Sequence, residues 1–150
     1  MNQDLIDLLR AFGDHRVEYL VVGAHALAAH GHVRATKDLD VWIRATPENA
    51  ARAYRALAAF GAPLSDLTEG DLATPGTVFQ IGVAPVRIDI LTHIDGVEFD
   101  EAWEARVSAS FGPVASQVLS REHLIRNKRA SGRLQDLADL ERLEGRADDD

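Results

Sequence analysis

The chain has 150 residues, 46% of them hydrophobic and 27% charged, with a formal net charge of −8 and no cysteine. This balance predicts one globular domain over residues 1–147, followed by a disordered acidic tail at 148–150. The missing cysteines exclude disulfides and thiolate metal sites, and no apolar run is long enough to span a membrane. We expect a cytoplasmic protein without a secretory signal, and the negative charge argues against broad nucleic-acid binding.

The first elements alternate between helix and strand. Apolar residues at helical spacing predict a helix over 5–12, which ends at a glycine. The β-branched and aromatic run 17–22 predicts a buried strand that Gly23 interrupts. A short alanine-rich helix is expected over 24–30, and a second strand over roughly 39–43.

The later elements are mostly antiparallel strands. A threonine N-cap followed by proline predicts a helix over 47–60, and the glycines and prolines of 62–76 predict a loop. The segments 77–83 and 86–92 flank a proline and predict a hairpin. Further along the chain we expect a strand pair (107–111 and 114–119) and two helices (one from Ser120, one over 134–143). This order predicts an α/β (α+β) fold with a small mixed sheet and helices packed mainly on one face.

Asp38 and Asp40 are the most informative residues. Side chains alternate along a strand, so these two carboxylates share one face. Asp40 also precedes the apolar run 41–43, where an unpaired buried carboxylate is costly. A divalent cation removes that cost, because carboxylate oxygens are the ligands that Mg²⁺ prefers. The alternative is a pair of loop aspartates that cap a turn.

Asp89 supplies a third carboxylate, at the centre of the core-like run 86–91. If this strand neighbours the strand at 39–43, Asp89 completes a cluster with Asp38 and Asp40. Three carboxylates can hold two cations about 3.5–4 Å apart for in-line displacement at phosphorus. Asp89 can then also accept the proton of the attacking hydroxyl. The alternative is an ion pair between Arg87 and Asp89 on an exposed strand.

Several other residues predict phosphate binding. The turn at Gly23 and Ala24 joins a strand to a helix, and its backbone N–H groups can cradle a phosphate. Arg34 and Lys37 can neutralise the site, although exposed loop cations are an equal alternative. Lys128 belongs to a basic cluster, where a solvated position is its alternative role. The tail residues Asp136 and Asp139 are expected to pair locally with Arg133 and Arg142.

The segment from Gly23-Ala24 to Asp38-Leu39-Asp40 resembles the hG[GS]-x(9–13)-Dh[DE]h signature of the polymerase-β-like nucleotidyltransferases. The stretch Arg34-Ala35-Thr36-Lys37-Asp38-Leu39-Asp40 is similar to small bacterial members related to the AbiEii toxins of type IV toxin–antitoxin systems. The tail from Lys128 through Arg133 to Asp139 resembles the K-x(4)-R-x-x-D-x-x-D ending of that group. The resemblance covers about 17–43, 86–92 and 121–143.

This resemblance implies that a nucleoside monophosphate passes from an NTP to an acceptor hydroxyl, with Mg²⁺ or Mn²⁺. Asp38, Asp40 and Asp89 match the metal-binding and catalytic aspartates, Gly23 matches the phosphate-turn glycine, and Lys128 matches the triphosphate lysine. Ala24 departs from the pattern, because the family usually has Gly or Ser there, so a catalytically inactive nucleotide- or partner-binding relative is the alternative. A metal-dependent phosphohydrolase is a third interpretation.

The partners implied are an NTP and an unidentified acceptor, which is a small molecule, a protein or a tRNA end. A cognate antitoxin is implied by the toxin-related group. A chain of this length has little room for a separate acceptor-binding domain, so a homodimer mate is expected to supply acceptor contacts. No membrane partner is expected.

Overall fold

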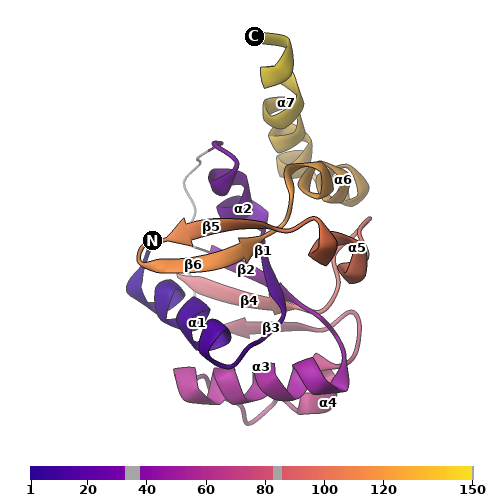
Figure 1. Ribbon diagram of the computed structural model, residues 1–150. Coiled ribbons are helices and arrows are strands. Elements are labelled where there is room, and N and C mark those ends of the chain that lie inside the picture. Colours follow the sequence, from indigo (N-terminus) through magenta and orange to yellow (C-terminus); the bar gives the residue numbers. More distant parts are fainter. Residues whose placement is uncertain (33–37, 83–85, 150) are drawn as a thin grey trace.

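The computed structural model describes residues 1–32, 38–82 and 86–149, with 146–149 described by their backbone only (Figure 1). Its helices are α1 (Gln3–Asp14), α2 (Gly23–Ala29), α3 (Pro47–Phe60), α4 (Glu69–Leu72), α5 (Phe99–Glu104), α6 (Arg121–Ser131) and α7 (Leu134–Asp149). Its strands are β1 (Tyr19–Val22), β2 (Asp38–Ile43), β3 (Val78–Ile81), β4 (Arg87–Leu91), β5 (Val107–Phe111) and β6 (Val114–Val118).

The strands form one mixed sheet in the order β3-β4-β2-β1-β6-β5. The pairs β2–β4 and β1–β6 are parallel, and the other neighbours are antiparallel. The predicted hairpin is therefore confirmed as β3–β4, and the later strand pair as β5–β6. The predicted α+β class with a small mixed sheet is also confirmed.

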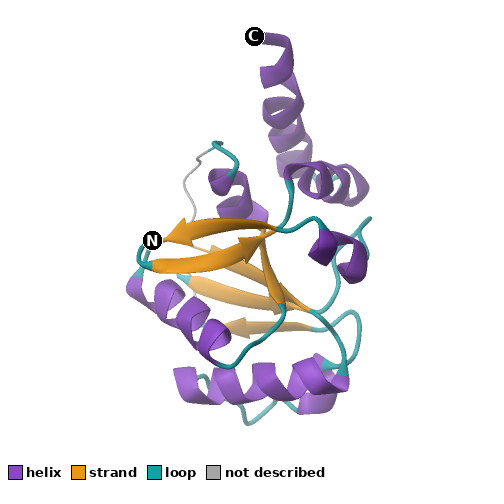
Figure 2. Cartoon of the chain, viewed as in Figure 1, coloured by secondary structure: helices purple, strands orange, loops and turns teal. Residues whose placement is uncertain are grey.

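The helices form two groups around this sheet. α1 contacts α3, and α3 contacts α4. α2 contacts β1 and β2 and also α6, which in turn contacts α7. Figures 1 and 2 show α7 extending away from the body of the molecule towards the C-terminus. None of the helices among the described residues is long and apolar enough to cross a membrane.

The core forms where the sequence places its apolar stripes. α1 buries a stripe at helical spacing, and Phe12 packs edge-on against Tyr19 at the start of β1 with ring centroids 5.5 Å apart. In β2 burial alternates, so Leu39 and Val41 are fully buried while the side chains between them face the other way. This alternation follows from the pleat of the strand and leaves Asp38 and Asp40 together on one face.

Three features differ from the sequence-based expectation. The predicted loop 62–76 contains α4, which is held by a capping box between Thr68 and Asp71. α5 was not predicted, because its six residues are too few to show a helical stripe. α7 continues to Asp149, past the expected end near 143.

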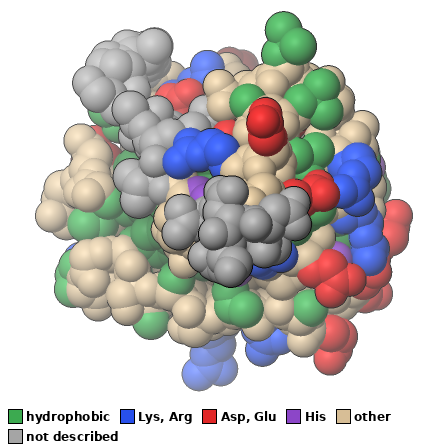
Figure 3. All heavy atoms as spheres, turned by 90° about the horizontal axis from the view of Figure 1, so that it is seen from above, with side chains coloured by type: hydrophobic (Ala, Val, Ile, Leu, Met, Phe, Trp, Pro, Cys, Tyr) green, Lys and Arg blue, Asp and Glu red, His purple; other side chains and the backbone are tan. Residues whose placement is uncertain are grey.

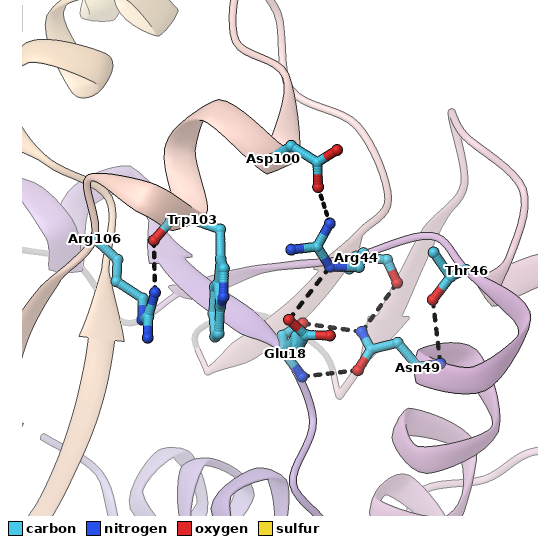
Figure 4. Close-up of polar contacts among 7 residues, drawn as sticks. All are labelled: Glu18, Arg44, Thr46, Asn49, Asp100, Trp103 and Arg106. Carbon is cyan, nitrogen blue, oxygen red and sulfur yellow. Dashed lines mark hydrogen bonds and ion pairs between the residues drawn. The ribbon is translucent and has the colours of Figure 1, made fainter.

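α5 is fixed to the end of β2 by an aromatic and ionic cluster, of which Figure 4 shows the ion pair between Arg44 and Asp100. Phe99 packs edge-on against Trp42 at 4.9 Å and stacks on Trp103 at 5.7 Å between ring centroids. The Arg44 guanidinium lies 4.7 Å from the centre of the Phe99 ring and forms an ion pair with Asp100. These contacts explain how a helix with no side-chain N-cap hydrogen bond is held in place.

Asn49 joins β1, β2 and α3 from a fully buried position. Its side-chain oxygen accepts from the Glu18 backbone N–H at 2.7 Å, and its amide donates to the Glu18 and Arg44 carbonyls at 3.0 and 2.9 Å. The Asn49 side chain thus provides partners for the Glu18 N–H and the Arg44 carbonyl, and a second donor for the Glu18 carbonyl, which also accepts from the Arg44 N–H at 3.2 Å.

Candidate functional site

The parallel pairing of β2 with β4 brings the predicted carboxylates together. In this register Asp40 lies opposite Asp89, and Asp38 lies opposite Arg87. Asp89 is 8% exposed, whereas the Asp38 side chain is 42% exposed. The sequence predicted a three-carboxylate cluster only if these two strands are neighbours. In the structure they are neighbours.

Gly23 lies against Asp40 at the first residue of α2. It has a φ of +67°, and a Cβ built on it would be 2.3 Å from Oδ2 of Asp40. Any side chain at this position would collide with the carboxylate, and the left-handed backbone would be strained. The neighbouring Val22 pairs with Asp40 across β1 and β2. The predicted phosphate turn is therefore in direct contact with the carboxylate cluster.

The electrostatics of Asp40 reflect this crowding. Burial, the negative charge of Asp89 together with a hydrogen bond to it, and the charge of Asp38 raise the pKa of Asp40 to about 6. The positive charge of Arg87 acts in the opposite direction but does not outweigh them. A cation placed between these groups would favour the ionised form of Asp40.

Arg87 bridges the other two carboxylates. Its Nε lies 3.1 Å from Oδ1 of Asp89, and its Nη2 donates to Oδ2 of Asp89 at 3.2 Å. The same Nη2 lies 3.6 Å from Oδ2 of Asp38. The ion pair between Arg87 and Asp89 that the sequence offered as the alternative thus exists, but on a strand whose central residues are buried.

The donor chemistry of this cluster fits a divalent cation. Three carboxylates converge, Asp40 carries a raised pKa, and Oδ1 of Asp89 is buried without a hydrogen-bond partner. Within the described ranges, no group of three or more His, Asp and Glu side chains already has the spacing of a metal site. In this arrangement the Arg87 guanidinium lies against Asp38 and Asp89.

A cavity of about 410 Å³ opens onto the cluster. Its lining includes Ala24 and all three aspartates on one side, and Lys128, Arg133 and Asp136 on the other. A second cavity, of about 370 Å³, shares Gly23, Asp40 and these three residues with the first. The two volumes therefore form a continuous cleft between the sheet and the α6–α7 pair.

Lys128 faces this cleft from α6 but is engaged by carboxylates of α7. It is 3% exposed, and its Nζ lies 2.9 Å from Oδ2 of Asp139 and 3.3 Å from Oδ1 of Asp136. Asp139 is completely buried. The structure thus places the lysine at the cleft wall in an ionic network, and its predicted contact with a triphosphate stays a prediction.

Asp136 also confirms the expected local pairing. Its Oδ2 accepts from Nε of Arg133 at 2.7 Å and from the hydroxyl of Ser131. Burial raises the pKa of Asp136, but these hydrogen bonds and the charge of Lys128 outweigh it and leave the pKa below its usual value. The hydrogen bond with Asp136 and the charge of that residue raise the pKa of Arg133, and the charge of Asp40 makes a smaller contribution in the same direction.

His93 and Asp95 line the far end of the cleft and were not predicted. His93 Nε2 lies 3.4 Å from Oδ1 of Asp95, and both side chains are more than half exposed. The backbone carbonyl of Asp95 accepts from Asn127 on α6 at 2.9 Å, which ties this turn to the helix. The signal was present in the sequence, because His93 continues the two-residue period that starts at Asp89.

Arg34 and Lys37, predicted to assist nucleotide binding, lie outside the described residues. Figure 3 views the molecule from above, with the undescribed residues in grey. On this face, Lys and Arg side chains are interspersed with Asp and Glu side chains rather than gathered into one basic area. This arrangement agrees with the net charge of −8.

No protein-family model matches the sequence, and no curated protein matches it. Solved structures do match in fold. A candidate nucleotidyltransferase (TM1012) from Thermotoga maritima has a TM-score of 0.61 and 15% identity, over 99% of this chain and 92% of that chain. The lincosamide antibiotic adenylyltransferase LnuA, with lincomycin bound, has a TM-score of 0.59 and 14% identity, over 96% of both chains. The chain therefore has a nucleotidyltransferase-like fold.

Proposed function

We propose that the protein is a nucleotidyltransferase that moves a nucleoside monophosphate from an NTP to the hydroxyl of an acceptor. The observation that carries the proposal is the register of β2 and β4, which puts Asp40 opposite Asp89 and directly beside Gly23. Carboxylates paired beside a glycine turn, in a cleft of this fold, suit a nucleotide polyphosphate better than an apolar ligand. The nucleotidyltransferase-like fold supports the same reading of the cleft.

Asp38, Asp40 and Asp89 would hold Mg²⁺ or Mn²⁺. The bound cation would neutralise the carboxylates and phosphates and favour ionisation of the acceptor hydroxyl. Asp89 is the candidate to accept the hydroxyl proton, since its carboxylate lies opposite Asp40 and lines the cavity. Gly23 would allow the polyphosphate to approach the backbone closely.

Cations would complete the nucleotide site. We propose that Arg34 and Lys37 contribute positive charge at the phosphates, from a segment outside the described residues. Lys128 would contribute mainly by fixing the cleft wall, because Asp136 and Asp139 already engage its ammonium group. Ala24 would offer only its backbone N–H, since its side chain has no hydroxyl.

The acceptor would enter at the end of the cleft that contains His93 and Asp95. The cavity of about 370 Å³ that they line also contains the apolar side chains of Leu91 and Ile94, and it reaches Gly23 and Asp40; a cavity of this volume suits a small molecule. The exposed carboxylate of Asp95 would repel the phosphates of a tRNA end. We therefore favour a small hydroxylated acceptor over a protein or a tRNA end. The lincomycin bound to LnuA is an example of such a ligand in a similar fold.

Membership of the AbiEii-related group rests on the sequence resemblance alone. A role as a toxin–antitoxin component, with a cognate antitoxin as partner, is part of the proposal on that basis. A homodimer and a cytoplasmic location are proposed for the reasons that the sequence offered. A small regulator encoded next to this protein would support the toxin–antitoxin assignment.

A catalytically inactive nucleotide- or partner-binding relative is the second candidate. The observation that favours it is Ala24, which is buried, lines the cavity and lacks the usual hydroxyl or open glycine backbone. Such a protein would bind an NTP without releasing pyrophosphate.

The deciding experiment uses α-labelled and γ-labelled forms of each NTP, with Mg²⁺ or Mn²⁺, on wild type and Asp40→Asn. The acceptors offered are the protein itself, total tRNA and small hydroxylated amines. We expect α-label on an acceptor and γ-label in pyrophosphate for wild type only. Nucleotide binding by both proteins without pyrophosphate release would instead establish the inactive relative. Label released to water as nucleoside monophosphate or orthophosphate would establish a phosphohydrolase.

A further inference from the structure

Arg87 occupies the position of a cation in the carboxylate cluster. Its guanidinium contacts Asp89 through two nitrogens, at 3.1 and 3.2 Å, and reaches Asp38 at 3.6 Å. Arg87 thus places a positive charge against two of the three carboxylates, where it offsets the repulsion among them.

The arginine side chain also borders open space. It is 36% exposed and lines the cavity of about 410 Å³. Only the backbone of Arg87 takes part in the sheet, where it pairs with Asp38. Rotation of the side chain into the cavity would therefore break two ion pairs and leave the strand register intact.

We propose that Arg87 is the resident counter-ion of the cation-free site, and that it exchanges its carboxylates for nucleotide phosphate when a divalent cation binds. This inference rests on the proposed function. A monovalent, delocalised guanidinium is a weaker partner for converging carboxylates than a hard divalent cation. A phosphate, in contrast, matches the planar guanidinium with two parallel hydrogen bonds. Arg87 therefore has a better partner elsewhere in the cleft once Asp38 and Asp89 are neutralised.

Two opposite effects of one substitution follow. Arg87→Gln removes the competing charge, so the site should bind a divalent cation more tightly. The same change removes the phosphate partner, so the cation-loaded site should bind a nucleotide more weakly. A residue with a purely structural role would not change the two affinities in opposite directions.

The test measures Mn²⁺ binding to metal-stripped protein by calorimetry, in the absence of nucleotide. Arg87→Gln should bind Mn²⁺ about tenfold more tightly than wild type, because one positive charge is lost within a few ångströms of the site. Arg87→Lys keeps the charge and should stay within about threefold of wild type on the same reasoning. Arg10→Gln, which removes a more exposed arginine from α1 (48% against 36%) and its ion pair with Asp7, should leave Mn²⁺ binding unchanged.

A second titration adds a non-hydrolysable ATP analogue to Mn²⁺-saturated protein. Arg87→Gln should bind the analogue about tenfold more weakly than wild type, since it lacks the bidentate phosphate contact. Equal or weaker Mn²⁺ binding by Arg87→Gln, or unchanged analogue binding, would overturn the proposal for Arg87. Mn²⁺ that binds to neither wild type nor Arg87→Gln would instead overturn the proposed function.

A measurement on the wild type covers the case in which Arg87→Gln does not fold. The Nε–Hε resonance of Arg87 can be assigned in the NMR spectrum by its loss in Arg87→Lys. We expect it to shift as Mg²⁺ is added, with the midpoint that calorimetry gives for Mg²⁺ binding. A resonance that stays fixed while Mg²⁺ binds would show that Arg87 keeps its carboxylates, contrary to the proposal.

Discussion

Asp40 lies directly opposite Asp89 in the parallel pairing of β2 and β4. Adjacent carboxylates in a partly buried sheet repel each other, and the pKa of Asp40 rises to about 6 as a result of burial and of Asp89. A folded protein tolerates such a pair when it serves a ligand that the pair can bind. This relationship therefore has consequences for stability as well as for function.

The first prediction concerns pH and the stability of the metal-free protein. The pKa of Asp40 is raised from 3.8 in the unfolded chain to about 6 in the fold, so the folded state binds its proton more tightly. The stability due to this group is complete below pH 3.8 and is lost as pH rises through about 6. At pH 8 the free energy of unfolding of Asp40→Asn should thus exceed that of wild type by about 2 to 3 kcal/mol.

Urea unfolding in EDTA at several pH values measures this difference. The gap between Asp40→Asn and wild type should shrink as the pH falls from 8 towards 4, because wild-type Asp40 then becomes protonated. A gap that is constant with pH, or an Asn variant less stable than wild type at pH 8, would contradict the assigned repulsion.

The second prediction concerns the glycine turn. Gly23→Ala would place a Cβ 2.3 Å from Oδ2 of Asp40 at a φ of +67°, so the fold must shift or lose stability. We expect a loss of about 3 kcal/mol or more in the free energy of unfolding, from strain and collision together. Gly31→Ala is the matched control, because Gly31 has a φ of +92° with nothing within 4 Å of the added Cβ.

Gly31→Ala should lose only about 1 kcal/mol, from backbone strain. Chemical denaturation of both variants checks the difference, and Mn²⁺ calorimetry should show weakened binding for Gly23→Ala alone. Equal losses in the two variants would mean that the contact between Gly23 and Asp40 has no energetic importance.

The third prediction concerns the buried network behind the cleft. Lys128→Met leaves Asp136 and Asp139 without their shared cation, and Asp139 is fully buried. Removing one member of a buried ionic network costs about 3 to 5 kcal/mol. Arg129→Met is the control on the same helix, since Arg129 pairs with Glu144 at the surface at 2.6 Å.

The control should lose less than about 1 kcal/mol, as surface ion pairs do. Thermal unfolding followed by circular dichroism measures both variants. A Lys128→Met variant as stable as Arg129→Met would show that Lys128 is not a structural cation, which would favour direct phosphate binding.

The fourth prediction concerns Asn49, whose side chain makes three hydrogen bonds with the backbone at a buried position (Figure 4). Asn49→Ala should lower the free energy of unfolding by about 2 to 4 kcal/mol, because these backbone groups lose their partners. Asn127→Ala removes one hydrogen bond at the surface and should lose less than about 1 kcal/mol. Comparable losses would rule out the role given to Asn49.

The sequence was sufficient to predict the elements whose patterns are local and strong. The helix over 47–60 has an N-cap, a first-turn proline and a terminal glycine, and the structure gives α3 the same bounds. The carboxylate cluster was predicted conditionally, because alternation places Asp38 and Asp40 on one face while only tertiary pairing brings Asp89 to them. That pairing is a long-range relationship that no local pattern encodes.

Other parts depended on contacts that a single sequence does not reveal. α5 is held by Phe99, Trp42 and Arg44 rather than by any internal stripe or cap. The position of Lys128 depends on the turn at Gly132, after which α7 returns its aspartates towards α6. The sequence offered the ion pair between Arg87 and Asp89 only as an alternative to a metal site. The geometry is compatible with both, one after the other.

The most direct measurement is a crystal structure with Mn²⁺ and a non-hydrolysable NTP analogue, using the anomalous signal of Mn²⁺. The account predicts an anomalous peak within coordination distance of the Asp40 and Asp89 carboxylates, with the analogue's phosphates beside Gly23 and against the same ion. The account would be contradicted if the anomalous peak and the analogue's phosphates lay on another part of the surface. It would also be contradicted if a crystal soaked to saturation with Mn²⁺ held no Mn²⁺ at these aspartates.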